Sequence, residues 1–308
     1  MEGKKECGME NSRLGKYRIT GTLGRGGQAL VYLAMDESLS RPVALKRLWN
    51  GGENQGVGKG EGGRMIRETE RDRLMQEAAF LRDLRHPMLP VVYDLFYEAG
   101  WYLVMEYIAG ISLHKYIESW GPVKEGQARF WAAALLDVLS YFHTRETPVI
   151  YRDLKPDNIM VCKDGSLRLV DFGGAEFRVF GEETDEGMVY SAGYAAPEQR
   201  ASVEQRAWAD ERSDIYAFGR TLYYMVTGAD LCAAPYGALS VSCYNPLLSV
   251  ELEEIIARCT AKAPGDRYQV VSEIVRDMER RGRRKGRGKG EFVQRVEKQI
   301  CLTGDFPI

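Results

Sequence analysis

The chain has no excess of charge of either sign, no closely spaced cysteines and few histidines. Its 42 basic and 44 acidic side chains give a formal net charge of −2 at pH 7, which provides no general attraction to nucleic acid or to an anionic membrane. The six cysteines are scattered, without a Cys-x-x-Cys pair and without a histidine nearby. This spacing argues against a disulfide framework and a zinc site, and it is typical of the reduced thiols of a cytoplasmic protein.

Long hydrophobic runs are also missing. Residues Met1–Glu6 are polar, and the most apolar helical run, Phe130–Leu139, is short and contains Asp137. Because a membrane-spanning helix needs about 20 predominantly apolar residues, we expect neither a membrane span nor a signal peptide. What is present is a chain of 308 residues, 44% of them hydrophobic, which is long enough to bury a core in one large domain or in two lobes.

The first third of the chain has the sequence pattern of β-strands. Short runs of β-branched and aromatic residues predict three strands within residues 17–46 and two more at Val91–Tyr97 and Trp101–Met105. Arg67–Arg85 has the spacing of an amphipathic helix. Half of the residues in Asn50–Gly63 are glycine, which predicts a flexible insertion. Five strands and one helix therefore make a small mixed lobe.

Beyond residue 110 helical patterns dominate. Helices are predicted at Gln127–Thr144, Asp210–Thr227 and Val250–Cys259. Two lobes of unlike structure would leave a cleft between them, and a ligand is expected there.

Six short motifs occur in a fixed order along the chain. They are Leu23–Tyr32, Val43–Lys46, Tyr151–Asn158, Asp171–Gly173, Gly193–Glu198 and Ser213–Gly219. Each motif alone would be weak, because short strings recur by chance. Together they resemble the catalytic core of the protein kinases, from about Tyr17 to about Arg280, and residues 153–161 and 193–199 are most similar to bacterial eukaryotic-like Ser/Thr kinases.

The resemblance implies a fold and a division into domains. The fold class is α+β, a bilobal protein-kinase-like fold with a five-stranded antiparallel sheet and one helix in the small N-lobe and a larger, mainly helical C-lobe. We expect an N-terminal tail at 1–16, a protein kinase domain at 17–281, and a basic, then mixed, C-terminal tail at 282–308. Within the domain, the N-lobe spans 17–106, the hinge 106–110 and the C-lobe 110–281.

The resemblance also assigns phosphoryl transfer to a few polar side chains. Asp153 is expected to act as the base for the acceptor hydroxyl, and Lys155 to neutralise the moving γ-phosphoryl group. Lys46 lies on an apolar strand, where an unpaired ammonium group would be costly, so it needs anions: the nucleotide phosphates and a helix glutamate. Glu77, beside the apolar stripe of the helix, is the best candidate. The alternative for Glu77 is a solvated surface acid.

A nucleotide site is implied at the glycine-rich turn and the apolar strands around it. Gly24, Gly26 and Gly27 would let backbone N–H groups approach phosphate oxygens, with Ala29 in place of the family's third glycine. A glycine-rich hairpin or an apolar strand residue taken alone more often has only a structural role. The candidates for nucleotide binding are Leu23, Gly24, Arg25, Gly26, Gly27, Val31, Ala44, Lys46, Met105, Glu106, Ile108, Met160 and Val170.

Metal binding and substrate class follow from the same motifs. Asn158 and Asp171 offer hard oxygen ligands, which suit Mg²⁺, with Mn²⁺ as a substitute. Lys155 matches the Ser/Thr-specific form of the catalytic loop, and Ser191 occupies the position whose hydroxyl bridges the catalytic Asp and Lys. The resemblance thus implies a non-specific serine/threonine protein kinase that uses Mg·ATP to phosphorylate protein substrates, including itself.

Two other functions fit the same fold. One is a pseudokinase scaffold, which would not need the complete polar set of Lys46, Glu77, Asp153, Asn158 and Asp171. The other is a small-molecule phosphotransferase, which would not need the features of a peptide-binding lobe. Those features are Ala196–Glu198, Asp214, expected to tie down the catalytic loop, and Arg267, expected to pair with Glu198.

Several positions bear on regulation. Tyr151 stands where the family usually has histidine, and we expect it to pack harmlessly in the core. Arg152 is the kind of cation that binds a phosphate on the activation segment, where the hydroxyls are Thr184, Tyr190 and Ser191. The acids within residues 182–186 are an alternative, permanent anion for Arg152, or simply part of a solvated loop.

The basic stretch Arg280–Lys289 is interpreted as a solvated tail, the alternative being a weak contact with an anionic surface. No nucleic-acid partner is expected. The sequence leaves the oligomeric state, including a dimer, open.

Overall fold

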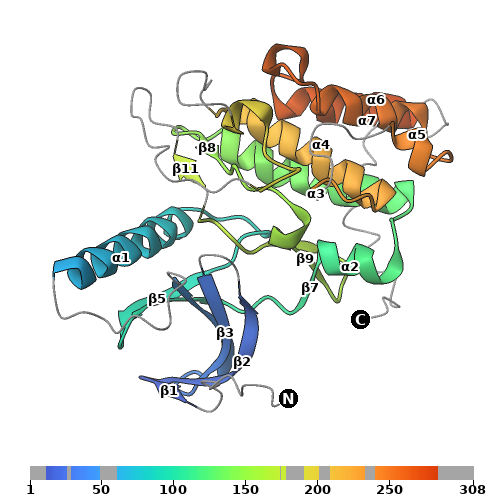
Figure 1. The fold of residues 1–308 in the computed structure, drawn as a ribbon. Helices are drawn as coiled ribbons and strands as arrows, with labels where there is room; N and C mark the ends of the chain where they lie inside the picture. The colour runs from blue at the N-terminus through green and yellow to red at the C-terminus, as the bar shows by residue number, and fades with distance from the viewer. Residues whose placement is uncertain are drawn as a thin grey trace, which may run out of the picture. The chain divides into compact units, whose positions relative to one another are not determined.

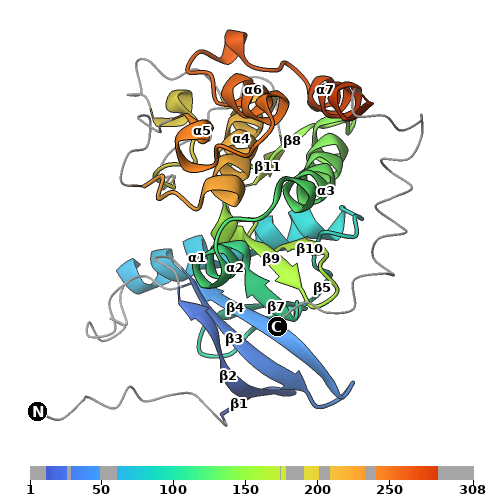
Figure 2. The same ribbon diagram turned by 90° about the vertical axis from the view of Figure 1, so that its right-hand side faces the viewer.

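The computed structural model describes residues 12–25, 29–48, 61–173, 175–177, 191–200, 209–232 and 240–283, with the backbone alone described at 61–70, 176–177, 200 and 281–283. The chain forms two compact units that divide after Ile108 (Figures 1 and 2). The division falls inside the segment 106–110 that the sequence marks as the link between lobes.

The first unit is built on an antiparallel sheet of six strands in the order β1-β2-β3-β4-β6-β5. The strands are β1 (Arg13–Leu14), β2 (Tyr17–Arg25), β3 (Ala29–Asp36), β4 (Arg41–Leu48), β5 (Val92–Tyr97) and β6 (Trp101–Glu106). The predicted sheet has five strands, so the count was wrong by one. The additional strand, β1, pairs Arg13 with Arg18 and Leu14 with Tyr17, and two residues are too few to show the alternation that marks a strand in sequence.

The helix of this unit, α1 (Glu61–Arg82), begins earlier than predicted. Its first three residues, Glu61–Gly63, belong to the stretch predicted to be flexible, and that prediction is wrong for them. Adding residues to the end of a nucleated helix costs little, so the penalty of about 1 kcal/mol for each glycine does not stop it. The rest of the glycine-rich stretch lies outside the described residues.

Both faces of the sheet are covered by hydrophobic side chains. On one face, Val43 and Leu45 of β4 join a cluster with Tyr32, Tyr102 and other aromatic and aliphatic residues. On the other face, Ala44 packs with Leu103, Met105 and Leu74, the last of which comes from α1. Because side chains alternate along a strand, Lys46 of β4 projects on the same side as Ala44, toward α1.

The second unit is mainly helical, as predicted. Its helices are α2 (Leu113–Trp120), α3 (Glu125–His143), α4 (Glu211–Thr227), α5 (Val241–Tyr244), α6 (Val250–Cys259) and α7 (Val271–Arg283). Three short strands form a sheet in the order β10-β9-β7, and two more form a separate pair, β8 with β11. They are β7 (Gly110–Ser112), β8 (Val149–Ile150), β9 (Ile159–Cys162), β10 (Leu167–Leu169) and β11 (Glu176–Phe177). Single 3-10 turns occur at η1 (Pro156–Asn158), η2 (Pro197–Arg200) and η4 (Pro264–Asp266).

Helix α4 forms the core of this unit. All of its residues from Ser213 to Val226 are buried, and it packs against α3 and α6 (Figure 1). A Cβ atom at Gly219 would lie 2.5 Å from the Cβ of Cys259, so the close packing of α4 on α6 requires glycine there. Asp210 caps the N-terminus of α4 by accepting from the N–H of Arg212.

Among the described residues, no helix combines the length and the apolar character that a membrane crossing requires. The cysteines among them are free thiols at Cys162, Cys232, Cys243 and Cys259.

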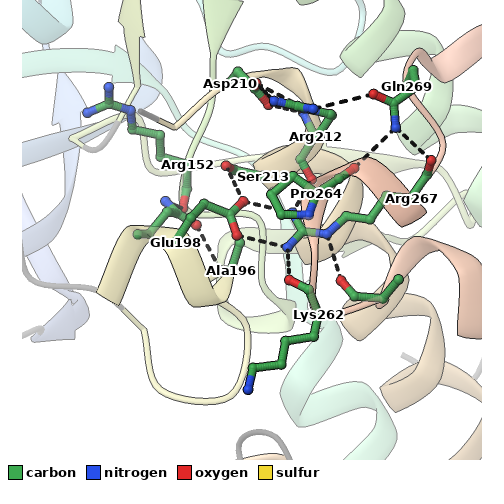
Figure 3. Close-up of polar contacts among 12 residues, drawn as sticks. Arg152, Ala196, Glu198, Asp210, Arg212, Ser213, Lys262, Pro264, Arg267 and Gln269 are labelled. Carbon is green, nitrogen blue, oxygen red and sulfur yellow. Dashed lines mark hydrogen bonds and ion pairs between the residues drawn. The ribbon is translucent and has the colours of Figure 1, made fainter. Parts of the chain in front are cut away.

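A buried ion pair joins the turn η2 to the segment before α7 (Figure 3). The guanidinium group of Arg267 donates to both carboxylate oxygens of Glu198, at 2.7 and 2.8 Å, and to the backbone carbonyls of Ala261, Lys262 and Arg212. The hydroxyl of Ser213 donates to Glu198 as well. This is the pairing of Glu198 with Arg267 that the sequence predicts, and it is saturated with hydrogen bonds.

Burial would raise the pKa of Glu198, but the hydrogen bonds and charge of Arg267, together with a bond from Ser213, hold that pKa below its usual value. A carboxyl group with a lowered pKa stabilises the fold above its unfolded pKa of about 4.3. That contribution is lost as the pH falls through the lower pKa of the folded state.

We predict that Arg267→Met lowers the free energy of unfolding by about 3–5 kcal/mol, because it leaves the carboxylate of Glu198 buried without its cation. Urea unfolding of the full chain measures the change. Arg82→Met is the control, since Arg82 pairs with Asp83 at a position where both side chains are mostly exposed. A loss for Arg267→Met no larger than for this control would contradict the prediction.

Candidate active site

A buried ion pair links β4 to α1 in the first unit. Lys46 extends from β4 and Glu77 from α1, and their side chains are only 6% and 4% exposed. Lys46 Nζ donates to both carboxylate oxygens of Glu77, at 2.8 and 2.7 Å. Leu74, one helical turn before Glu77 and fully buried against the sheet, anchors α1 so that Glu77 faces β4. The structure therefore brings together the two residues that the sequence pairs.

Several predicted nucleotide-binding residues lie on neighbouring strands of the same unit. Val31, Ala44 and Met105 share one cluster beside α1, and Ala44 lies opposite Met105 in the sheet. Gly24 lies opposite Val31, and Arg25 opposite Leu30, where β2 ends and β3 begins. Leu23, on β2, is 41% exposed. Gly26 and Gly27 lie outside the described residues.

Glu106 and Ile108 lie at the end of the first unit. The N–H of Glu106 donates to the carbonyl of Val91 at 2.8 Å, and Ile108 is buried. Met160 and Val170, the other apolar candidates, belong to the second unit. Met160 lies on β9 between Ser112 and Arg168, and the N–H of Val170 donates to the carbonyl of Asn158.

Four polar side chains form one connected cluster in the second unit. Asp153 receives hydrogen bonds from Lys155 Nζ at 2.8 Å and from the hydroxyl of Ser191 at 2.7 Å. Lys155 Nζ also donates to the oxygen of Ser191 at 2.6 Å. Asn158 Nδ2 donates to Asp153 twice, to its backbone carbonyl at 2.9 Å and to its carboxylate at 2.8 Å. The hydroxyl of Ser191 thus bridges Asp153 and Lys155, as the sequence predicts.

Asp171 is attached to this unit through its backbone. The phenol of Tyr151 donates to the carbonyl of Asp171 at 2.6 Å, and the ring of Tyr151 lies between Phe142 and Phe172. The carboxylate of Asp171 accepts from the N–H of Gly173 at 3.1 Å. Tyr151 packs in the core as predicted, but its hydroxyl also has a specific partner, which a hydrophobic pattern does not reveal.

The carboxylate of Asp214 holds the start of the catalytic loop. It accepts from the backbone N–H groups of Tyr151 and Arg152, at 2.9 and 2.8 Å, and contacts His143 Nε2 at 2.9 Å. Arg152 has a φ of 65°, a left-handed conformation that is unusual for a residue other than glycine. Asp214 is therefore the anchor that the sequence predicts, and it holds a strained backbone.

The donor atoms present suit a hard divalent cation. Asn158 uses its amide nitrogen on Asp153, which directs its carbonyl oxygen elsewhere, and Asp171 provides a carboxylate. One amide oxygen and one carboxylate match the oxygen ligands preferred by Mg²⁺, which keeps its remaining positions for water and phosphate oxygens.

Other predicted residues cannot be placed. Thr184, Tyr190 and the acids within 182–186 lie outside the described residues, as does the basic stretch after Arg283.

Comparison with known proteins decides the family. Residues 17–276 match the model of the protein kinase domain. The chain belongs to the protein kinase domain family. Over 277 residues it is 32% identical to serine/threonine-protein kinase PrkC of Bacillus subtilis (strain 168). This alignment covers 86% of this chain and 40% of PrkC. The chain is also 31% identical over 277 residues to the probable serine/threonine-protein kinase PknB of Lactococcus lactis, which covers 85% of this chain and 41% of PknB.

A solved structure supports the fold independently. The structure named "PpkA-294 apo form" aligns with a TM-score of 0.68 at 23% sequence identity and covers 87% of this chain and 98% of that one. This likeness shows the bilobal protein kinase fold. The chain spans about two fifths of the length of the curated relatives named above.

We predict that Tyr151→Phe lowers the free energy of unfolding by about 0.5–1.5 kcal/mol, because it removes the hydrogen bond from the phenol to the carbonyl of Asp171 and keeps the ring. Urea unfolding measures the change. The control is Tyr141→Phe, in which the lost hydroxyl accepts from Arg145 one helical turn away, and we expect less than about 0.5 kcal/mol there. Equal effects of the two variants would show that the hydroxyl of Tyr151 has no special role.

Proposed function

We propose that this chain transfers the γ-phosphoryl group of Mg·ATP to serine and threonine hydroxyls of proteins, its own included. The observation that carries the proposal is the cluster of Asp153, Lys155, Asn158 and Ser191, in which a carboxylate and an ammonium group meet at a hydroxyl oxygen. A hydroxyl oxygen held between a base and a cation is the arrangement that phosphoryl transfer to an alcohol needs.

The roles of these side chains follow from their chemistry. Asp153 would orient the acceptor hydroxyl and take its proton as the new O–P bond forms and the bond between the β and γ phosphates breaks, leaving ADP. Lys155 would offset the charge on the transferred group. The contact of Ser191 with both residues shows that a short aliphatic hydroxyl can reach them. This supports serine and threonine as acceptors.

The first unit would contribute to binding the nucleotide. Lys46, held by Glu77, is a preorganised cation for phosphate oxygens. Val31, Ala44 and Met105 offer an apolar surface for adenine, and Leu23, Gly24, Arg25, Gly26 and Gly27 would cover the phosphates. Since the N–H of Glu106 is used by Val91, the base edge would pair with the carbonyl of Glu106 and the N–H of Ile108.

We propose that the metal is Mg²⁺, with Mn²⁺ as a substitute, held by Asn158 and Asp171. A bound divalent cation would neutralise phosphate charge and fix the phosphate geometry. Because ATP is the phosphoryl donor, we place the activity in the cytoplasm. Protein substrates are the expected partners. For Arg280–Lys289 the favoured interpretation is a solvated tail, and a weak contact with an anionic surface is its alternative.

The first test identifies which residues of the chain become phosphorylated. The wild-type chain, incubated with labelled ATP and Mg²⁺, should carry phosphate on serine or threonine by mass spectrometry, and Asp153→Asn should reduce the rate by about 10²–10⁴-fold. Asp164→Asn, which changes an exposed turn acid, is the matched control and should keep full activity. Label absent from the wild type, or equal in Asp153→Asn, would refute the proposal, and label on tyrosine alone would refute the acceptor class.

The second test concerns the buried cation. Lys46→Met should lower kcat/KM for ATP by about 10²–10³-fold, as expected for loss of one preorganised charge at a phosphate. Lys16→Met removes a half-exposed lysine in the turn between β1 and β2 and should leave initial rates unchanged. If the two variants behave alike, Lys46 does not contact the nucleotide.

A further inference from the structure

The side chain of Gln199 is nearly fully buried at the turn η2 and has no place in the roles described so far. It is 2% exposed. Its Oε1 accepts from the N–H of Ala196 at 2.9 Å, and its Nε2 faces the carbonyl oxygen of Arg152 at 3.5 Å. One amide group therefore spans from the turn that contains Glu198 to the catalytic loop, and Figure 3 shows Arg152, Ala196 and Glu198 around that turn.

The carbonyl that Gln199 faces belongs to the peptide group that joins Arg152 to Asp153. The N–H of this same peptide group donates to the carbonyl of Tyr151 at 2.9 Å, which closes a three-residue turn around Arg152. With a φ of 65° at Arg152, this turn belongs to the rare, strained form. Asp214 holds the N-terminal side of the turn through the N–H of Arg152, and Gln199 contacts its C-terminal side.

Only a side chain with both a donor and an acceptor at this length can make the two contacts. A glutamate carboxylate could accept from the N–H of Ala196, but its second oxygen would face the carbonyl oxygen of Arg152, and the two would repel each other. A methionine thioether is a weak acceptor and has no donor, so it would replace neither hydrogen bond. Neighbouring Glu198 is bound to Arg267 and Ser213 instead. The turn η2 is thus attached through Glu198 to the helical core and through Gln199 to the catalytic loop.

We propose that Gln199 is a positioning residue for Asp153: it couples the turn at Ala196–Glu198 to the strained peptide group that precedes the base. The inference rests on the proposed function and extends it. Displacing that peptide group would shift the carboxylate of Asp153 relative to the acceptor hydroxyl. Because the hydrogen bonds of Gln199 go to Ala196 and Arg152, neither of which is assigned to the nucleotide, its loss should affect turnover and not the binding of ATP.

The test compares wild type, Gln199→Met and Gln199→Glu in the full chain, with Mg·ATP and a serine-containing peptide. Gln199→Met keeps the volume and removes both hydrogen bonds, so we expect kcat to fall about ten- to a hundredfold with KM for ATP unchanged. Gln199→Glu should be impaired most at alkaline pH. A buried carboxyl group facing a carbonyl oxygen favours its protonated form, which can donate again, so its kcat relative to wild type should rise as the pH falls.

The matched control is Gln269→Met. The amide of Gln269 also donates to backbone carbonyls, those of Pro264, Gly265 and Arg267, but it lies at η4 away from the catalytic loop (Figure 3). We expect it to lower the melting temperature at most, with kcat and its pH profile unchanged. Thermal melts of every variant distinguish a loss of folding from a displacement of Asp153 in a folded chain.

The outcomes are distinct from those of the proposed function. An inactive wild type refutes the function itself, whereas an active wild type with kcat for Gln199→Met within twofold of it overturns only the role of Gln199. A pH-independent activity ratio for a folded Gln199→Glu overturns it as well. If Gln199→Glu does not fold, Gln199→Met decides alone. If neither variant folds, Gln199 is a general structural residue and the proposal fails.

Discussion

The loop that carries Asp153 depends on Asp214, a carboxylate with no exposed surface at the start of α4. Burying a charge without partners costs several kcal/mol, so its three contacts, with the N–H groups of Tyr151 and Arg152 and with His143, are required for its burial. The same contacts hold Arg152 in a left-handed conformation that costs about 1–3 kcal/mol. The strained backbone of the loop is thus held by a carboxylate whose removal would be costly, and Asp153, which follows Arg152, is held in place with it.

Helix α4 extends this anchoring to the segment that carries Ser191. At the middle of the helix, Arg220 is buried and its Nε donates to the carbonyl of Gly193 at 2.7 Å. Gly193 has a φ of 84°, and a Cβ atom there would lie 2.6 Å from the carbonyl oxygen of Leu231, so only glycine fits. Ser191 in turn contacts Asp153 and Lys155. One rigid, buried helix therefore positions two separate loops whose side chains meet.

The first unit keeps a charged lysine in an apolar environment. The ammonium group of Lys46 and the carboxylate of Glu77 are both desolvated, and each makes the burial of the other tolerable. The geometry depends on packing, because Leu74 fixes α1 against Leu103 and Met105 of the sheet. Phosphate binding by Lys46 would therefore depend on where α1 lies as much as on β4.

The sequence by itself determined the parts of the site that are local or periodic. Asp153, Lys155 and Asn158 lie within six residues. The resemblance to the protein kinases implies Lys46 and its partner on the helix, and the apolar stripe of that helix points to Glu77. The tertiary structure alone decided what the backbone carbonyls bind: that of Asp171 accepts from Tyr151, that of Gly193 from Arg220, and that of Arg152 faces Gln199. Every residue carries the same carbonyl group, so no pattern of side chains marks which of them a distant donor will reach. The packing of α4 and of the loops around it determines which carbonyl each donor reaches.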